Sequence, residues 1–267
     1  MTMIGRTIGQ ERPSAWHAWR IVFRVLAFLI VLLLAVNLAV YGLPLLERPE
    51  DPFPGQLLYV TTFDAYNEQW TQERGQARTI VADGALLASS EAESDGIYSA
   101  LDRILGNFDL SVDVTWRQVP DDYGQFVVLF RLQDPEHYYA FRVRADGAYR
   151  VEVVNGNPSA PDVLSEWQIS PHIAIGEGAV NRVRVVAQAF IFSFVVNDEL
   201  LPLCLRGQDR RSTWTGPRTG ECMSDGGRTR DEAVDRSFER GQIALGAYAV
   251  TPGLEVSFDN VLVVGPR

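Results

Sequence analysis

The chain has 267 residues, of which 46% are hydrophobic and 22% are charged, and its formal net charge at neutral pH is −10. This composition is typical of a folded protein and excludes a disordered one. All 24 basic residues are arginines, and the 19 arginines of residues 51–267 face 31 acidic residues there, a formal charge of −12. Binding to a phosphate backbone needs a basic surface, so we expect no nucleic-acid partner.

An apolar run near the N-terminus is long enough to cross a bilayer. Residues 25–46 are apolar apart from Asn37, and a helix needs about 20 such residues to span the hydrocarbon core. Arg6, Arg12, Arg20 and Arg24 precede the run, so the positive-inside rule places the N-terminus in the cytoplasm and the rest outside. The alternative is a cleaved signal peptide, whose apolar core is usually only about 7–15 residues.

We therefore expect four segments, with the protein held in the cell (inner) membrane of a bacterium. Residues 1–20 are cytoplasmic, and residues 21–46 form a transmembrane helix in contact with the lipid bilayer. Prolines stiffen a stalk at residues 47–56, because each one fixes its φ angle. Residues 57–267 form one extracytoplasmic domain.

Short strands separated by turns fill this domain. From Phe108 to Arg117, apolar and polar residues alternate, which places the two sets on opposite faces of a strand. Three more such runs follow at residues 126–132, 138–144 and 149–154. Four consecutive strands with short turns predict an antiparallel meander, whose apolar face a second layer must cover. About a dozen strands, with no amphipathic helix after residue 57, indicate an all-β sandwich.

The segment at residues 198–240 interrupts this rhythm. It is a long polar insert that contains both cysteines, Cys204 and Cys222. Outside the cytoplasm two such cysteines predict a disulfide, with two free thiols as the alternative. The insert also holds several arginines and Trp214. These residue types are enriched at protein interfaces, so the insert is a candidate contact for subunits of a membrane complex.

Several segments carry a resemblance to a known fold. They are Val128-Leu-Phe-Arg-Leu-Gln-Asp-Pro135, Tyr138-Tyr-Ala-Phe-Arg142, Gly241-Gln-Ile-Ala-Leu-Gly246 and Val256-Ser-Phe-Asp-Asn-Val261. They resemble the concanavalin A-like lectin/glucanase jelly roll, and more closely the bacterial 3-keto-disaccharide hydrolase, or family 16 glycoside hydrolase-like, family. The resemblance covers residues 57–264 apart from the insert. It implies an antiparallel jelly-roll sandwich whose relatives serve as lectin-like modules, enzymes or spacers.

The catalytic acids that this resemblance would imply are missing from their expected place. Family 16 enzymes carry Glu, Asp and Glu at alternating positions of one strand. Here Glu91, Glu93 and Asp95 alternate, but they lie just before a strand and in a different order. A retaining glycosidase needs two carboxylates about 5–5.5 Å apart. We therefore assign no catalytic residue and favour binding over catalysis.

Lectin sites combine aromatic rings with planar polar groups, and Tyr138 is the best such residue in the meander. Alternation places it on one face with Arg142 and Arg144, and Tyr123 and Trp167 are candidates for the rim. A network of carboxylate–guanidinium pairs is the simpler explanation for the charges on that face. Alternation assigns the other aromatic residues of these strands to the core: Trp116, Phe126, Phe130, Phe141 and Tyr149. The predicted ligand-binding residues are Tyr138, Arg131, Arg142, Arg144, Asp113 and Trp214.

The resemblance also implies a structural calcium ion. Asp259 matches the final-strand ligand of related jelly rolls, with Asp64 and Gly96 near the supporting positions. Calcium takes six to eight oxygens, so carbonyl groups and waters would have to complete the site. The alternative is that Asp259 caps backbone amides where the two ends of the domain meet. We expect no other cofactor.

The sequence thus predicts a membrane-anchored, extracytoplasmic, lectin-like module with a glycan as its small ligand. One alternative is an accessory subunit of a membrane complex, which would use the transmembrane helix and the insert as contacts. The other is a glycoside-processing hydrolase.

Overall fold

The computed structural model describes residues 15–37, 51–65, 67–92, 95–205, 213–215, 222–224 and 230–267. The chain forms two compact units, residues 1–50 and residues 51–267. The first unit contains helix α1 (Ala15–Asn37), which begins earlier than the predicted span of residues 21–46. The described residues include no helix whose length and hydropathy meet the requirement for a membrane span. Residues 38–46 of the predicted span lie outside the described residues.

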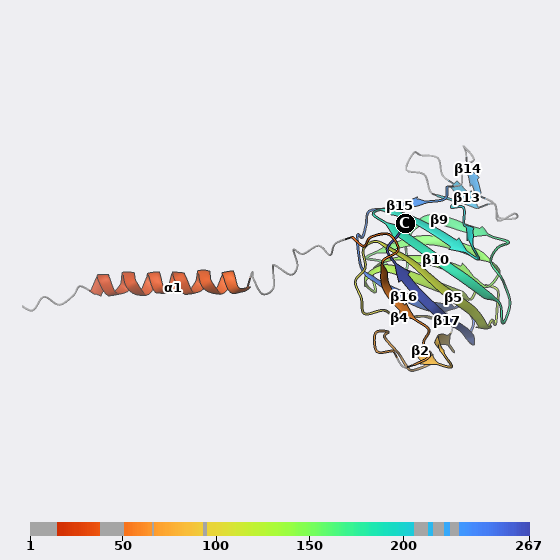
Figure 1. Ribbon diagram of the computed structural model, residues 1–267, viewed down its shortest axis with the longest axis horizontal. Coiled ribbons are helices and arrows are strands. Elements are labelled where there is room, and N and C mark those ends of the chain that lie inside the picture. The colour runs from red at the N-terminus through yellow and green to blue at the C-terminus, as the bar shows by residue number, and fades with distance from the viewer. Residues whose placement is uncertain are drawn as a thin grey trace, which may run out of the picture. The chain divides into compact units, whose positions relative to one another are not determined.

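Two antiparallel sheets face each other in the second unit (Figure 1). In the nine-stranded sheet the order is β12-β11-β10-β5-β17-β3-β2, with β1 paired to β17 and β15 paired to β11. Its strands are β1 (Leu57–Thr61), β2 (Ala77–Ala82), β3 (Ala85–Ser90), β5 (Phe108–Gln118), β10 (Val180–Gln188), β11 (Ile191–Val196), β12 (Glu199–Leu200), β15 (Ala233–Val234) and β17 (Leu254–Val264).

The six-stranded sheet has the order β4-β16-β6-β7-β8-β9. Its strands are β4 (Asp95–Ala100), β6 (Gln125–Asp134), β7 (His137–Arg144), β8 (Ala148–Asn155), β9 (Asp162–Ile169) and β16 (Gln242–Ala249). The all-β sandwich predicted from the sequence is therefore confirmed.

The predicted four-stranded meander is wrong in its first strand. Strands β6, β7, β8 and β9 do form a meander, but β5 pairs with β10 and β17 in the opposite sheet. The turn between β5 and β6 therefore crosses from one layer to the other. Trp116 of β5 and Phe126 of β6, expected to lie in one sheet, instead pack across the layers, with ring centroids 5.2 Å apart.

The inward-facing side chains of both sheets form one apolar core. The residues assigned to it by alternation, Trp116, Phe126, Phe130, Phe141 and Tyr149, are all at most 1% exposed. Aromatic contacts join the layers, because Phe141 of β7 stacks on Phe194 of β11 with centroids 4.8 Å apart. The period-two pattern was thus a reliable guide to the core.

The insert at residues 198–240 is anchored to the sandwich at its base. Leu201, Leu203 and Cys204 are fully buried, and Leu203 pairs with Arg230. Farther along, β13 (Thr213–Thr215) pairs with β14 (Cys222–Ser224). The insert predicted to be polar therefore has apolar side chains at its base, which hold it in the core. The side chain of Cys222 lies outside the described residues, so the disulfide stays a prediction.

Candidate functional site

The outer face of the six-stranded sheet holds a second apolar cluster, separate from the core. Its residues point away from the sandwich interior at alternating positions, and Tyr98 and Tyr248 pack against it. The cluster consists of Ala100, Val127, Leu129, Leu132, Tyr138, Ala140, Val154 and Ala244. An outward face of an antiparallel sheet is ordinarily polar. The residues of this apolar floor are at most 8% exposed, so the half-buried Tyr98 and Tyr248 that pack against them form the accessible part of this face.

Two Gly-x-Tyr segments position the bordering tyrosines. Gly96 and Tyr98 lie on edge strand β4, and Gly246 and Tyr248 lie on β16. The antiparallel register sets each tyrosine opposite the other strand's glycine. A Cβ added to Gly96 would be 3.3 Å from the Tyr248 ring, and one added to Gly246 would be 2.7 Å from Tyr98 Cβ. At Gly246 only glycine leaves room beside Tyr98, whereas at Gly96 a Cβ would require the Tyr248 ring to move by a few tenths of an ångström.

A groove of about 440 Å³ lies beside Tyr98, between β4, the end of β6 and residues 71–77. Carboxylates of Glu73 and Asp134 are among its lining groups, together with the amides of Gln133 and Gln242. Burial raises the pKa of the Tyr98 hydroxyl, and the charges of Glu73 and Asp134 raise it further. The hydroxyl therefore stays protonated at neutral pH. The groove offers an aromatic ring with hydrogen-bond donors and acceptors, the combination typical of small-molecule sites.

An arginine pair lies on the same face, farther along strands β7 and β8, which also carry Tyr138 and Val154 of the apolar floor. Arg142 of β7 and Arg150 of β8 are directly opposite each other. Glu152 lies between them, pairing with Arg142 Nε and lying 3.2 Å from Arg150 Nε. The Glu152 side chain is only 3% exposed, and the two arginine side chains are 19% and 20% exposed. Like charges directly opposite each other repel, so the one carboxylate is needed to hold them together.

Arg144 and two aromatic rings continue this row. Its guanidinium pairs with Asp146 and lies 5.0 Å from the centroid of the Tyr123 ring and 5.1 Å from that of Trp167. Arg150 also approaches the Trp167 ring, at 5.9 Å. Cation–π contacts of this kind hold guanidinium and ring in fixed positions. The outer face therefore presents tyrosines and carboxylates on β4 and its neighbours, and arginines and Trp167 on β7–β9.

Three of the six predicted ligand-binding residues lie on this face. Tyr138 belongs to the apolar floor, and Arg142 and Arg144 belong to the arginine row. The alternation of β7 placed them correctly, and the rim candidates Tyr123 and Trp167 lie beside them. The side chain of Trp214 lies outside the described residues, as do Glu93 and the side chain of Asp95 in the acidic trio.

Arg131 does not lie on this face, contrary to the sequence-based expectation. The register of β6 shifts after Phe130, and Arg131 has a φ of +50°. Such a bulge reverses the alternation, and the side chain turns inward, where it is 0% exposed. Its guanidinium donates to three backbone carbonyls, those of Gly106, Ala189 and Phe238. Arg131 is therefore a structural tie between chain segments.

Asp113 is also misplaced by the sequence prediction, because β5 belongs to the opposite sheet. Its carboxylate accepts two hydrogen bonds from Arg182 of β10, at 2.9 and 3.2 Å, and one from Asn260. The bonds from Arg182 hold the pKa of Asp113 below its ordinary value. Asp109 and Arg184 form an equivalent pair. The expected carboxylate–guanidinium network thus exists, with β10 arginines as its cations.

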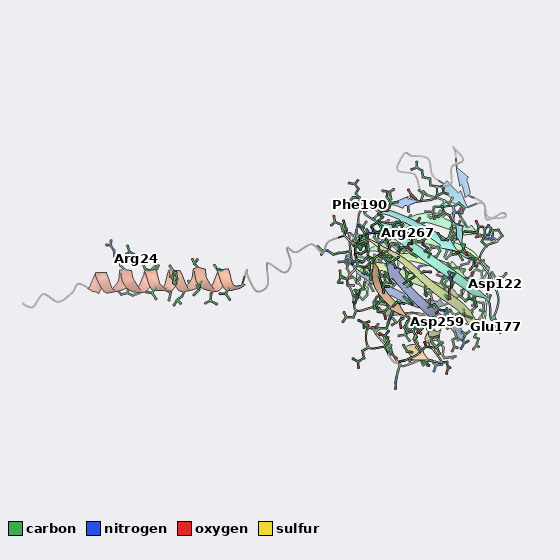
Figure 2. The ribbon with its side chains drawn as sticks, viewed as in Figure 1. Arg24, Asp122, Glu177, Phe190, Asp259 and Arg267 are labelled. Carbon is green, nitrogen blue, oxygen red and sulfur yellow. The ribbon has the colours of Figure 1, made fainter. Side chains whose placement is uncertain are left out.

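The residues of the predicted calcium site are divided between the two sheets: Asp64 follows β1, which pairs with the strand of Asp259, and Gly96 lies in the six-stranded sheet. Asp259 projects from β17 (Figure 2), whereas Gly96 is paired within the six-stranded sheet. Asp259 accepts hydrogen bonds from the backbone N and the side chain of Asn260, and Asp64 accepts one from Thr62. Within the described part of the chain, no three His, Cys, Asp or Glu side chains form a metal-binding group. The calcium ion therefore stays a prediction, and Asp259 caps the amide of Asn260 in this structure.

Sequence reasoning missed Tyr98, Tyr248, Arg150 and Glu152. The repeated Gly-x-Tyr pattern in two strands was the available signal for the tyrosines. That the two copies would face each other depends on the pairing of β4 with β16, which lie more than 140 residues apart in sequence. Their partnership could not be seen along the chain.

Comparison with solved structures identifies the fold. The domain is similar to the carbohydrate-binding module CBM66 from Bacillus subtilis, with a TM-score of 0.52 and 15% identity over 73% of this chain and 95% of that one. It is also similar to a Bacillus subtilis protein of unknown function with a galectin-like fold, with a TM-score of 0.52 and 12% identity over 81% and 100%.

The domain has the concanavalin A-like jelly-roll fold. A third similar structure, described under endo-acting O-glycanases from human gut microbiota that initiate mucin breakdown, has a TM-score of 0.51 and 12% identity over 79% of this chain and 100% of that one. Neither a sequence-family model nor a curated protein matches the chain. At these identities the similarities establish the fold, and the ligand has to be argued from the site.

Proposed function

We propose that this protein is a carbohydrate-binding module that takes a glycan on the outer face of its six-stranded sheet. The observation that carries the proposal is the pair of tyrosines held over glycines beside a groove lined by Glu73 and Asp134. A sugar ring has apolar C–H faces and a rim of hydroxyl groups. Aromatic rings suit the faces, and carboxylates and amides accept and donate hydrogen bonds to the rim.

The test is a glycan array followed by calorimetry on the full-length chain in detergent, with matched tyrosine variants. We expect Tyr98→Ala and Tyr248→Ala each to weaken binding about tenfold, because each removes an aromatic contact. Tyr98→Phe keeps the ring and should retain most of the affinity. The control is Phe53→Ala, which removes an aromatic side chain that is 66% exposed and outside this face. Absence of binding to every glycan by the wild-type chain would refute the proposal.

The membrane location is also part of the proposal. The apolar run of residues 25–46 and the arginines before it support an uncleaved anchor with the domain outside the cytoplasm. Protease treatment of intact spheroplasts would test this, because an external domain is digested and a cytoplasmic one is protected. Protection of the domain would refute the anchor in this orientation.

The two other hypotheses stay predictions. The accessory-subunit hypothesis depends on the insert, of which residues 206–212, 216–221 and 225–229 lie outside the described part of the chain. The hydrolase hypothesis depends on the resemblance to the keto-disaccharide hydrolases, and loss of turnover in Asp113→Ala would support it. Glycan binding has the more specific structural support, because its residues are all described.

A further inference from the structure

The arginine pair on the outer face carries more positive charge than its ion pairs with the described residues compensate. Arg142 and Arg150 share a single carboxylate, that of Glu152, so the three side chains together have a charge of +1. Each of the three is at least 80% buried from solvent. Water therefore screens the excess charge less than it would on an open surface. This local excess stands out in a domain whose formal charge is −12.

The hydrogen bonding of Arg150 is incomplete as well. Its Nε lies 3.2 Å from Glu152 yet makes no hydrogen bond with any described residue, and the atom is shielded from solvent. Arg144, by contrast, is paired with its own carboxylate, Asp146. A buried donor without a partner is costly. Of the arginines in this row, Arg142 and Arg150 therefore share the charge that an added anion would balance, through their exposed guanidinium atoms and not through the shielded Nε of Arg150.

We propose that the glycan bound on this face contains an acidic sugar whose carboxylate is recognised by Arg150 and Arg142. The inference rests on the proposed function and specifies its ligand class. A carboxylate has one negative charge, which equals the excess on the site, and its two oxygens match the fork of a guanidinium. Trp167, which contacts Arg150, lies where it could meet the ring of the same sugar.

The experiment uses oligosaccharides in acid and methyl-ester forms that differ only in charge. Oligogalacturonate, oligoglucuronate and alginate oligomers, each with its methyl ester, are titrated into the full-length chain by calorimetry. We expect at least one acid form to bind about tenfold more tightly than its ester, because only the acid makes charge-assisted bonds. Raising the salt concentration should weaken binding of the acid and leave that of the ester unchanged.

Two variants each remove the excess charge. Arg150→Gln leaves Arg142 and Glu152 as a neutral pair, and Arg142→Gln leaves Arg150 and Glu152 as one. Each variant should fold and lose the preference for the acid. Arg78→Gln is the control, since Arg78 lies on β2 of the other sheet and is 47% exposed.

The outcomes separate this inference from the proposed function. Equal affinity for acid and ester, or binding of neutral glycans alone, would overturn the acidic-sugar inference and leave the carbohydrate-binding proposal standing. A preference for the acid that persists in Arg150→Gln would also overturn it. Absence of binding to any glycan would overturn both.

Discussion

Replacing Gly246 by alanine tests whether the paired Gly-x-Tyr segments hold the binding face together. The new Cβ would lie 2.7 Å from Tyr98 Cβ and 2.8 Å from Tyr98 Cα, whereas ordinary contacts begin at 3.4 Å. Tyr98 would therefore have to move by about 0.7 Å, and the carbonyl of Ile97, which is closer still, by more. These are backbone atoms of edge strand β4, so the strand has to shift as a unit.

Overpacking a well-packed region typically lowers the free energy of unfolding by about 1–3 kcal/mol. Because the obstruction is backbone and not a flexible side chain, we expect a loss of about 3 kcal/mol, at the top of that range. For a domain of this size, each kcal/mol lowers Tm by roughly 2–4 °C, which corresponds to a decrease of about 6–12 °C. The displaced Tyr98 should also reduce glycan affinity.

Thermal unfolding of the full-length chain, followed by near-ultraviolet circular dichroism, measures this change. Gly106→Ala is the matched control, because a Cβ there would meet its nearest atom, the carbonyl oxygen of Glu239, at an ordinary 3.7 Å. If Gly246→Ala and the control unfolded at the same temperature, β4 would be free to give way at no cost. The argument that glycine is required at this position would then be refuted.

Three further predictions concern other parts of the domain. Asp113→Asn should lessen the loss of stability in acid. Arg182 lowers the pKa of Asp113, so the ion pair stabilises the fold above the ordinary pKa of 3.8. This contribution disappears as the pH falls below that value. Urea unfolding at a series of pH values measures this, and parallel profiles for the two proteins would contradict it. Arg131→Met leaves three backbone carbonyls without their hydrogen-bond donor. It should lower the free energy of unfolding, measured in urea, by about 2–4 kcal/mol. Unchanged stability would mean that burying the cation costs as much free energy as its hydrogen bonds supply. Reduction with dithiothreitol should destabilise the domain by about 3 kcal/mol if Cys204 and Cys222 close a loop of about 18 residues, and a thiol titration that finds two free cysteines in the unreduced protein would disprove the disulfide.

The alternation of residues fixed much of the fold in advance, because side chains of a strand point to opposite faces whatever the strand pairs with. Phe108, Val112 and Trp116 were assigned to the core on this basis, and each is fully buried. The alternation did not determine the sheet to which β5 belongs. A short turn between two strands is compatible with a hairpin or with a crossing to the facing layer, and the pairing of β5 with β10 and β17 shows that it crosses.

The candidate site was predictable only where it follows one strand. Tyr138, Arg142 and Arg144 share β7, so periodicity alone grouped them. Arg131 failed because a bulge reversed its direction, and a bulge of this kind has no dependable sequence signal. Asp113 failed because its strand pairs with β10, where Arg182 supplies the partner.

By itself, the sequence determined the all-β character of the domain, its core residues and the outward position of the arginines on β7, since these follow from the local period of two. The tertiary structure alone decided which strands are neighbours. That choice depends on contacts between segments far apart in the chain, and it brought Tyr98 beside Gly246 and set Arg150 against Arg142 and Glu152. The binding face is assembled from such pairings, so its chemistry became visible only once the two sheets were formed.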